Sequence, residues 1–185
     1  KLLVENDVSA GGGFSAIWND ITIKGTGANP AALDILSISP ATYQEDGARK
    51  TISTGKLTLE NVDLEANVVF RFNQASNELN FMDSSVYWHT RDPVFLTGMD
   101  LSINSLSGDN EWKGTSGLTV PSVTTLNVDS GSSFTFESVG SATNRSSRLA
   151  FTNGATVNVD SATLLFRNSG VDFGASSTMN VTNNA

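Results

Sequence analysis

Apolar residues recur along this chain at one long spacing. Ile35, Leu57, Leu79 and Leu101 follow one another at 57 − 35 = 22, 79 − 57 = 22 and 101 − 79 = 22 residues. After a wider middle stretch the spacing returns, for example between Val157 and Met179 (179 − 157 = 22). A period of this size is typical of chains whose repeats stack as coils. The spacing therefore predicts a repetitive, elongated architecture.

Within each period, apolar and polar positions alternate. Doublets such as Leu57/Leu59, Leu79/Phe81 and Leu126/Val128 enclose one residue that would point outward. This alternation predicts strands with one buried face, and no stretch carries apolar residues at helical spacing. Gly, Asn, Asp and Ser separate the doublets and suit turns. Stacked strands also allow ladders of like side chains, for which Asn is particularly suited.

The predicted fold is an all-β, right-handed parallel β-helix, or β-solenoid, with about 22–23 residues and three short strands per coil. An antiparallel sandwich or jelly roll would also show short strands. The long spacing has no role in such a fold and favours the solenoid. We expect residues 1–185 to form one domain, with loop insertions at 28–50 and 104–117, where the rhythm breaks.

Composition narrows the choice of partner. The net charge is −8, and the eleven Lys and Arg residues are scattered. Neutralising phosphates requires clustered basic side chains, so we expect no nucleic-acid partner. No apolar run approaches the roughly 20 residues of a membrane span, so we expect no membrane insertion of this segment. Cysteine is absent, which fits an exported protein as readily as a cytosolic one. The chain ends within its repeat, which predicts that it is a fragment of a longer exported protein.

Two segments contain candidate binding residues. The single histidine lies in residues 86–93, beside two aromatic side chains and an arginine, and a second Trp lies in residues 108–114. Aromatic and basic groups stack on sugar rings or contact a partner. The other interpretation is a coil corner with a partly buried Trp, because Trp is highly buried on average. The predicted binding residues are Tyr87, Trp88, His89, Arg91 and Trp112.

We find little sign of catalytic or metal chemistry. One His and no Cys cannot supply the usual zinc ligands, and the chain has no nucleophile elbow or phosphate loop. We therefore predict no catalytic residue, no metal and no cofactor. Asp34, Glu78 and Asp100 share a register, interrupted by Lys56. That row would either hold a cation or a basic partner, or form a solvated face beside the core.

Repeated short phrases resemble one group of exported proteins. Asn-Val-Asp-Ser occurs at 127–130 and 158–161, and 180–182 echoes it as Asn-Val-Thr. With the phrase at 151–159, they resemble the β-helical passenger regions of bacterial autotransporter adhesins. The resemblance implies export, display at the bacterial cell surface through an outer-membrane anchor not present here, and adhesion or self-association through the sides of the shaft. It implies no particular site residue.

The sequence thus predicts a non-catalytic cell-surface adhesin or self-association module. It would bind a host glycan, an extracellular-matrix protein or another copy through an extended polar face. One alternative is a carbohydrate-active β-helix enzyme, a polysaccharide lyase or hydrolase. That enzyme would place two or three Asp or Glu of adjacent coils in a groove, beside Arg or Lys. Another alternative is a receptor-binding domain similar to those of phage tail fibres.

Overall fold

A computed structural model describes residues 15–17, 20–25, 31–35, 51–66, 69–72, 74–88, 94–95, 100–114, 123–139 and 149–183 of the chain. The regular structure of these residues consists of strands in three sheets, and every paired strand is parallel to its neighbour. Among the described residues there is no helix long and apolar enough to cross a membrane.

Each sheet is one side of a solenoid. Sheet A contains β1 (Ser15–Ile17), β4 (Thr51–Thr54), β7 (Val69–Phe72) and β10 (Val94–Phe95). Sheet B contains β2 (Asp20–Lys24), β5 (Lys56–Glu60), β8 (Ser76–Met82), β11 (Asp100–Ser107), β13 (Val123–Val128), β15 (Leu149–Asp160), β17 (Val171–Phe173) and β18 (Thr178–Thr182). Sheet C contains β3 (Ala31–Ile35), β6 (Val62–Ala66), β9 (Ser85–Trp88), β12 (Asp109–Lys113), β14 (Ser133–Glu137) and β16 (Thr163–Arg167).

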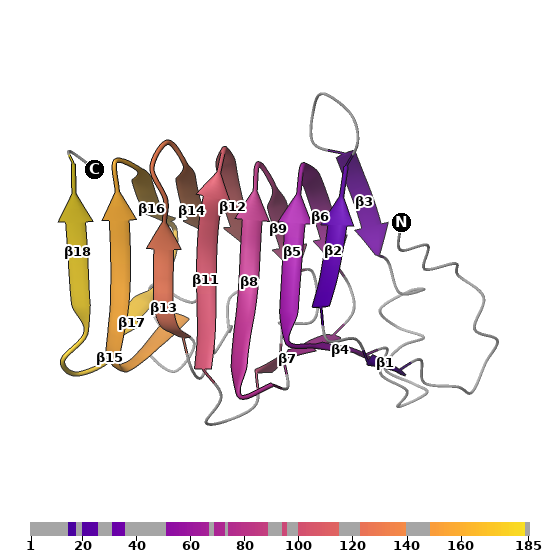
Figure 1. Cartoon of the computed structure of the whole chain (residues 1–185), viewed down its shortest axis with the longest axis horizontal. Helices are drawn as coiled ribbons and strands as arrows, with labels where there is room; N and C mark the ends of the chain where they lie inside the picture. Colours follow the sequence, from indigo (N-terminus) through magenta and orange to yellow (C-terminus); the bar gives the residue numbers. More distant parts are fainter. Residues whose placement is uncertain are drawn as a thin grey trace.

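The winding of the chain confirms the predicted solenoid. In Figure 1 the strands of sheet B other than β17 run upward at the front, the chain crosses over the top, and the strands of sheet C run down behind them. Each later level lies farther to the left, which makes the turn right-handed. Successive strands of one sheet come from successive levels, such as β5, β8 and β11 in sheet B.

The vertical register differs from the expected one. Within the row Ile35, Leu57, Leu79 and Leu101, only the step from Leu57 to Leu79 pairs as predicted, and the later step from Val157 to Met179 also pairs as predicted. Ile35 lies in sheet C opposite Ala66, and Leu101 lies opposite Asn77. The inward row of sheet B is instead Ile21, Leu57, Leu79, Ile103, Leu126, Val157 and Met179.

The predicted row is wrong because the levels differ in length. Along the inward row the steps are 57 − 21 = 36, 79 − 57 = 22, 103 − 79 = 24, 126 − 103 = 23, 157 − 126 = 31 and 179 − 157 = 22 residues. Four steps therefore lie close to the predicted coil length, and two are longer. An extra residue or two between strands shifts the pairing without disturbing the alternation inside each strand.

The loop expected at 104–117 is wrong for residues 104–113, which complete β11 and form β12. Two inward positions there are polar: Ser105 is 0% exposed and Asn110 is 2% exposed. Because polar residues occupy these inward positions, the sequence shows no apolar doublet there and predicts a loop for this segment. Of the loop expected at 28–50, residues 31–35 form β3, and 28–30 and 36–50 lie outside the described residues, as do 115–117 of the other expected loop.

Aromatic side chains fill much of the core behind sheet C. Phe134 contacts Phe81 and Phe136 edge to face, with ring centroids 5.0 and 4.8 Å apart. Phe136 stacks on Phe166 at 5.3 Å. Edge-to-face and offset-stacked pairs are the favoured aromatic geometries. The core thus continues through several levels as one column of rings.

The corner between sheets B and C repeats a left-handed backbone conformation. Asn61, Asp83 and Ser161 have φ values of 51°, 49° and 47°, and Gly108 has 71°. Asn, Asp and Gly adopt this region at low cost. A Cβ atom on Gly108 would lie 2.7 Å from the Cβ atom of Asp83 in the level before, so this corner also needs the small residue for packing.

Candidate functional site

One continuous ladder of amides runs along the outside of sheet B. The outward residues at the centres of β8, β11, β13, β15 and β18 are Asn80, Asn104, Asn127, Asn158 and Asn180, which pair in register. The Nδ2 of each of the last four donates to the Oδ1 of the Asn one level earlier, at 2.7, 2.8, 2.8 and 2.8 Å. The ladder of like side chains considered from the sequence is confirmed.

The ladder leaves half of each interior amide's hydrogen-bonding capacity facing outward. An Asn side chain has two N–H donors and two acceptor lone pairs. The ladder uses one donor and one lone pair at each interior level. The other donor and the other lone pair of each amide point away from the sheet, and they recur once per level, about 4.8 Å apart along the shaft.

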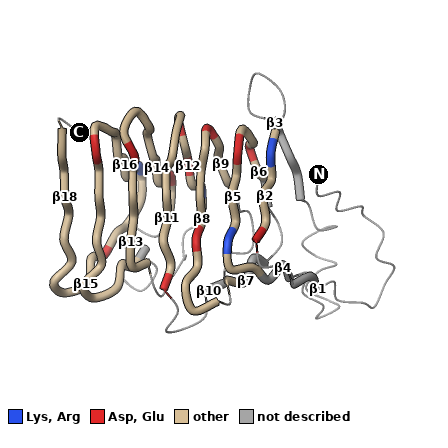
Figure 2. The backbone as a smooth tube through the Cα atoms, viewed as in Figure 1, with Lys and Arg blue, Asp and Glu red and all other residues tan. Residues whose placement is uncertain are grey.

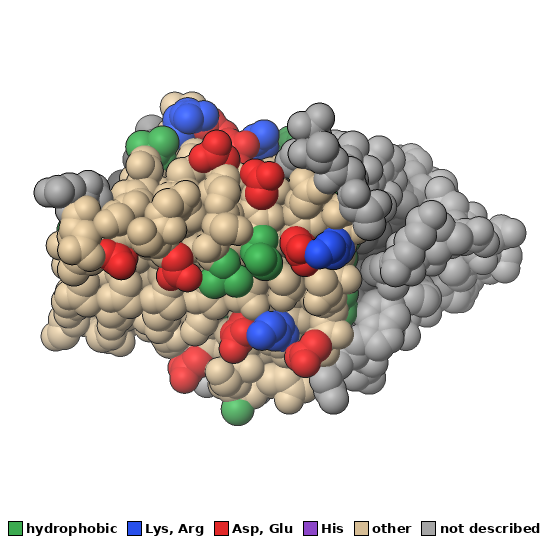
Figure 3. All heavy atoms as spheres, turned by 45° about the horizontal axis from the view of Figure 1, so that its top comes forward, with side chains coloured by type: hydrophobic (Ala, Val, Ile, Leu, Met, Phe, Trp, Pro, Cys, Tyr) green, Lys and Arg blue, Asp and Glu red, His purple; other side chains and the backbone are tan. Residues whose placement is uncertain are grey.

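A row of hydroxyl groups lies beside the ladder. The outward position two residues before the ladder Asn carries a hydroxyl group in each strand, and these residues pair in register: Ser102, Thr125, Thr156 and Thr178. We call the outward side chains Ser102, Thr125, Thr156, Thr178, Asn104, Asn127, Asn158 and Asn180 the amide face. Figure 3 shows its area over β13, β15 and β18 without charged side chains, except for carboxylates along its upper border.

The earlier end of sheet B is charged. Lys56 contacts Glu78 at 2.9 Å, and Lys24 pairs with Glu60. The hydrogen bond from Lys56 lowers the pKa of Glu78, and the same bond raises the pKa of Lys56. Figure 2 shows these charges on β2, β5 and β8.

The expected row of acidic residues is therefore wrong. Glu78 lies opposite Lys56 and Ser102, whereas Asp100 lies opposite Ser76. Asp34 lies in sheet C opposite Glu65. Glu78 belongs to an alternating-charge row that continues into hydroxyl groups, rather than to a carboxylate row.

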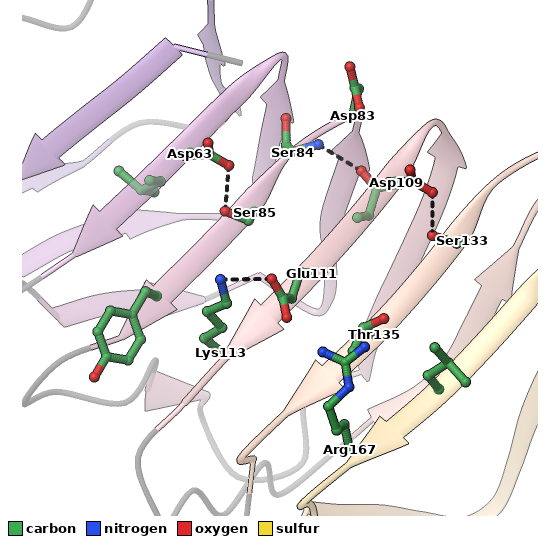
Figure 4. A pocket seen from close by; sticks show the side chains of 14 residues that line it. Asp63, Asp83, Ser84, Ser85, Asp109, Glu111, Lys113, Ser133, Thr135 and Arg167 are labelled. Carbon is green, nitrogen blue, oxygen red and sulfur yellow. Dashed lines mark hydrogen bonds and ion pairs between the residues drawn. The ribbon is translucent and has the colours of Figure 1, made fainter. Parts of the chain in front are cut away.

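A second surface is the hollow on the outside of sheet C, with a volume of about 690 Å³, which we call the sheet C groove. Four carboxylates line it, from Asp63, Asp83, Asp109 and Glu111, against the two cations of Lys113 and Arg167. The groove is thus acidic overall. Figure 4 shows these side chains extending from neighbouring strands across one open surface.

Hydrogen bonds between levels hold the groove's side chains in place. The Ser85 hydroxyl donates to Asp63 at 2.6 Å, and the Ser133 hydroxyl donates to Asp109 at 2.7 Å. Lys113 contacts Glu111 at 2.8 Å (Figure 4). These contacts fix three of the four carboxylates through groups on their own or the adjacent strand.

Below the groove, buried polar groups connect three levels. The backbone N–H of Ser84 donates to Asn110 Oδ1 at 2.9 Å, and Asn110 Nδ2 donates to Ser105 Oγ at 2.9 Å. Ser105 Oγ in turn lies 3.1 Å from Ser132 Oγ. Ser84 and Asn110 also line the groove, so the network supports the groove directly from below.

The structure separates the residues predicted for binding. Tyr87 is 36% exposed and lines the sheet C groove. Trp112 is 0% exposed, and its ring lies 6.1 Å from that of Phe136 in the core. Its indole therefore faces inward, and we do not include it in a binding surface. Trp88 ends β9, but its side chain lies outside the described residues, as do His89 and Arg91 entirely.

Sequence reasoning missed Glu111, Lys113 and Arg167. The alternation in Asp109-Asn110-Glu111-Trp112-Lys113 was the available signal, because it places Glu111 and Lys113 on the face opposite Trp112. Arg167 comes from a strand two levels later than Lys113, and β14 lies between them. Only the register brings them to one surface.

Comparison with other proteins gives no family. No protein-family model, curated protein or solved structure matches this chain. Within the described part of the chain, no group of three His, Cys, Asp or Glu side chains is arranged to hold a metal ion. The amide face and the sheet C groove are therefore the two surfaces whose geometry points to a function.

Proposed function

We propose that this chain is a non-catalytic adhesin module of the bacterial cell surface that associates with a second copy of itself through the amide face. The observation that supports the proposal best is the one-directional amide ladder beside an uncharged row of hydroxyl groups. It supplies an extended polar face of the kind that the sequence predicted.

The repeat distance favours a second copy as the partner. The outward donors and acceptors recur once per level, about 4.8 Å apart. A second copy of this chain has the same spacing between levels, and its amide and hydroxyl groups both donate and accept hydrogen bonds. In a two-fold arrangement the same face contacts itself, so the two lattices remain matched along the shaft.

Charge restricts how far two shafts overlap. The charged groups of β2, β5 and β8, such as Lys56 and Glu78, would lose water if another shaft covered them. The amide face on β13, β15 and β18 contains only Thr and Asn in its two rows. An arrangement in which only these later levels face each other avoids that cost.

The area predicts weak pairing between single molecules. Three strands spaced at about 4.8 Å, each about 17 Å long, offer roughly 250 Å² per copy, or roughly 500 Å² in total. Stable specific interfaces usually exceed about 1,000 Å² in total. Many copies on one surface would strengthen the overall attachment, because each pair that forms raises the effective concentration of its neighbours. Such multivalent pairing suits adhesion between two coated surfaces.

The proposal also includes display at the bacterial cell surface and a second copy as the partner. Export through an outer-membrane anchor is supported by the Asn-Val-Asp-Ser phrases and their resemblance to autotransporter passenger regions. A host glycan or a matrix protein are the other partners for the same face. The test below distinguishes them, because only self-association requires the amide face on both surfaces.

A bead-clustering assay tests the proposal. Beads coated with the purified chain should cluster in buffer without another protein, and clustering should change little between low and high salt, because the face is neutral. Thr156→Lys should abolish clustering by burying a charge in that face. Thr22→Lys is the matched control on the charged end of sheet B, and it should cluster like the wild type.

Folding of both variants is checked by their urea midpoints. Clustering that Thr156→Lys leaves intact in a folded protein would remove the amide face from the proposal. Clustering only with beads that carry a glycan or a matrix protein would assign one of those partners instead.

One observation favours the alternative of a carbohydrate-active enzyme. Asp83, Asp109 and Glu111 line the sheet C groove from adjacent levels, with Lys113 beside them. This is the arrangement that the sequence argument required of a hydrolase or lyase. Reproducible release of reducing ends or unsaturated products from a polysaccharide, lost in Glu111→Gln, would place this function first. The adhesin proposal expects no turnover.

A further inference from the structure

The sheet C groove has two exposed apolar surfaces separated by polar groups. Tyr87 on β9 is 36% exposed, and Leu165 on β16 is 43% exposed. β12 and β14 lie between these strands. Three strand spacings of about 4.8 Å separate the two side chains by about 14 Å along the shaft.

We infer that the sheet C groove binds an uncharged oligosaccharide that lies along the shaft, with one sugar ring on Tyr87 and another near Leu165. Sugar rings present apolar C–H faces and a rim of hydroxyl groups. Binding sites of this kind combine apolar platforms with a few convergent polar groups that fix orientation. A phenol ring is a suitable platform because it is apolar and carries a polar tip.

The groups between the platforms match the rim of a sugar chain. Glu111 and Lys113 lie on β12, and Ser133 and Thr135 lie on β14, all lining the groove. They supply both acceptors and donors, and hydrogen bonds to ionised groups are the stronger ones. Each level therefore offers contacts to one ring of an extended chain.

The charge of the groove selects against anionic sugars. Its four carboxylates outnumber its two cations. Both cations already have acidic partners, since Lys113 contacts Glu111 at 2.8 Å and Arg167 contacts Glu137 at 3.2 Å. A uronic-acid polymer would meet a surface of its own sign, and like-charge contacts oppose association.

The groove is also arranged before any ligand arrives. Ser85 and Ser133 orient Asp63 and Asp109, and the buried side chain of Asn110 supports the surface from below. Affinity gains when the binding groups need no ordering. The inference does not depend on the amide face, because the groove lies on sheet C and the amide face lies on sheet B.

Titration calorimetry of the whole chain tests the inference. The probes are two neutral tetramers, maltotetraose and chitotetraose, and an anionic tetramer of galacturonic acid. At least one neutral tetramer should bind saturably, and the anionic tetramer should not. Tyr87→Ala should raise the dissociation constant about three- to tenfold, the range expected for loss of one stacking contact. Tyr87→Phe, which keeps the ring, should change it less than about twofold.

Leu106→Ala is the matched control, because Leu106 is similarly exposed at 38% but lies on sheet B. Its affinity should equal that of the wild type. Absence of saturable binding by both neutral tetramers overturns the inference. Equal binding of the anionic tetramer, or an equal loss in Leu106→Ala and Tyr87→Ala, also overturns it. Bead clustering by the amide face proceeds or fails independently of these results.

Discussion

Asn110→Ala should destabilise the chain more than removal of the half-buried ladder amide of Asn158. Asn110 is 2% exposed and lies at the corner between sheets B and C. Its Oδ1 accepts from the Ser84 backbone N–H at 2.9 Å. Its Nδ2 donates to Ser105 Oγ and to the Ser107 carbonyl, both at 2.9 Å.

The magnitude follows from which of these partners keeps another contact. The Ser107 carbonyl also accepts from the Asp83 N–H at 2.8 Å, and Ser105 Oγ also lies 3.1 Å from Ser132 Oγ. The buried Ser84 N–H is the group left without its side-chain acceptor. An orphaned buried donor costs about 1–3 kcal/mol, and the lost hydrogen bonds add about 1 kcal/mol. We therefore expect a loss of about 2–4 kcal/mol in the free energy of unfolding.

Asn158→Ala is the matched comparison. Asn158 also makes two side-chain hydrogen bonds, to Asn127 and from Asn180, both at 2.8 Å. Its side chain is only half-buried, so water can replace both bonds. We expect a loss of about 0.5–1.5 kcal/mol for this variant.

Urea unfolding followed by circular dichroism gives both values. The midpoint should fall in each variant while the slope with denaturant stays unchanged. Amide hydrogen exchange at the Ser84 N–H should also speed up in Asn110→Ala, because that N–H loses its acceptor. If Asn110→Ala costs no more than Asn158→Ala, water compensates at the corner, and the assignment of this network as a buried support is refuted.

Three other changes test the core, the stacking of levels and the surface charges. Phe136→Ala should lower the free energy of unfolding by about 3–5 kcal/mol, because Phe136 is 0% exposed at the centre of the aromatic column. An equilibrium urea curve measures this loss, and a loss under about 1 kcal/mol contradicts that packing. Gly174→Ala should locally disorder the last level, because the added Cβ would lie 2.4 Å from the Thr152 carbonyl carbon. Limited proteolysis should cut the variant there faster than the wild type. Equal cutting counts against the close approach of Gly174 to the Thr152 backbone. Glu78→Gln should lower stability at pH 7 by under about 1 kcal/mol, since both partners of the Lys56 pair are 43% exposed. The pKa of Glu78 is lowered in the fold, so its contribution is present above its unfolded value of about 4.3 and is lost as pH falls through the folded value; a wild-type advantage that persists unchanged at pH 2 would contradict this sign.

The sequence predicted the repeating elements better than their alignment. Doublets such as Leu57/Leu59 identify strands, because alternation is local and each strand buries one face whatever its neighbours are. The Asn ladder was foreseeable for the same reason, since Asn127 and Asn158 occupy equivalent places in repeated phrases. Register depends instead on the number of residues between strands, and it moved Ile103 rather than Leu101 opposite Leu79.

The candidate site was less accessible to sequence reasoning. Trp112 looked like a surface aromatic among polar neighbours, yet those neighbours include Asn110, which is itself buried. Sequence alone does not show that a polar side chain will find hydrogen bonds from the level before it. Tyr87 was identified as a binding residue, but its groove partner Leu165 lies 165 − 87 = 78 residues away.

The sequence by itself determined that this chain forms short parallel strands in stacked coils, because alternation and a long period together leave few ways to bury the apolar side chains. The tertiary structure decided which outward residues share a surface. The amide face and the sheet C groove each collect side chains from several levels, and the spacing between levels varies from 22 to 36 residues along the chain. Hydrogen bonding between neighbouring strands, rather than distance along the chain, places those side chains together.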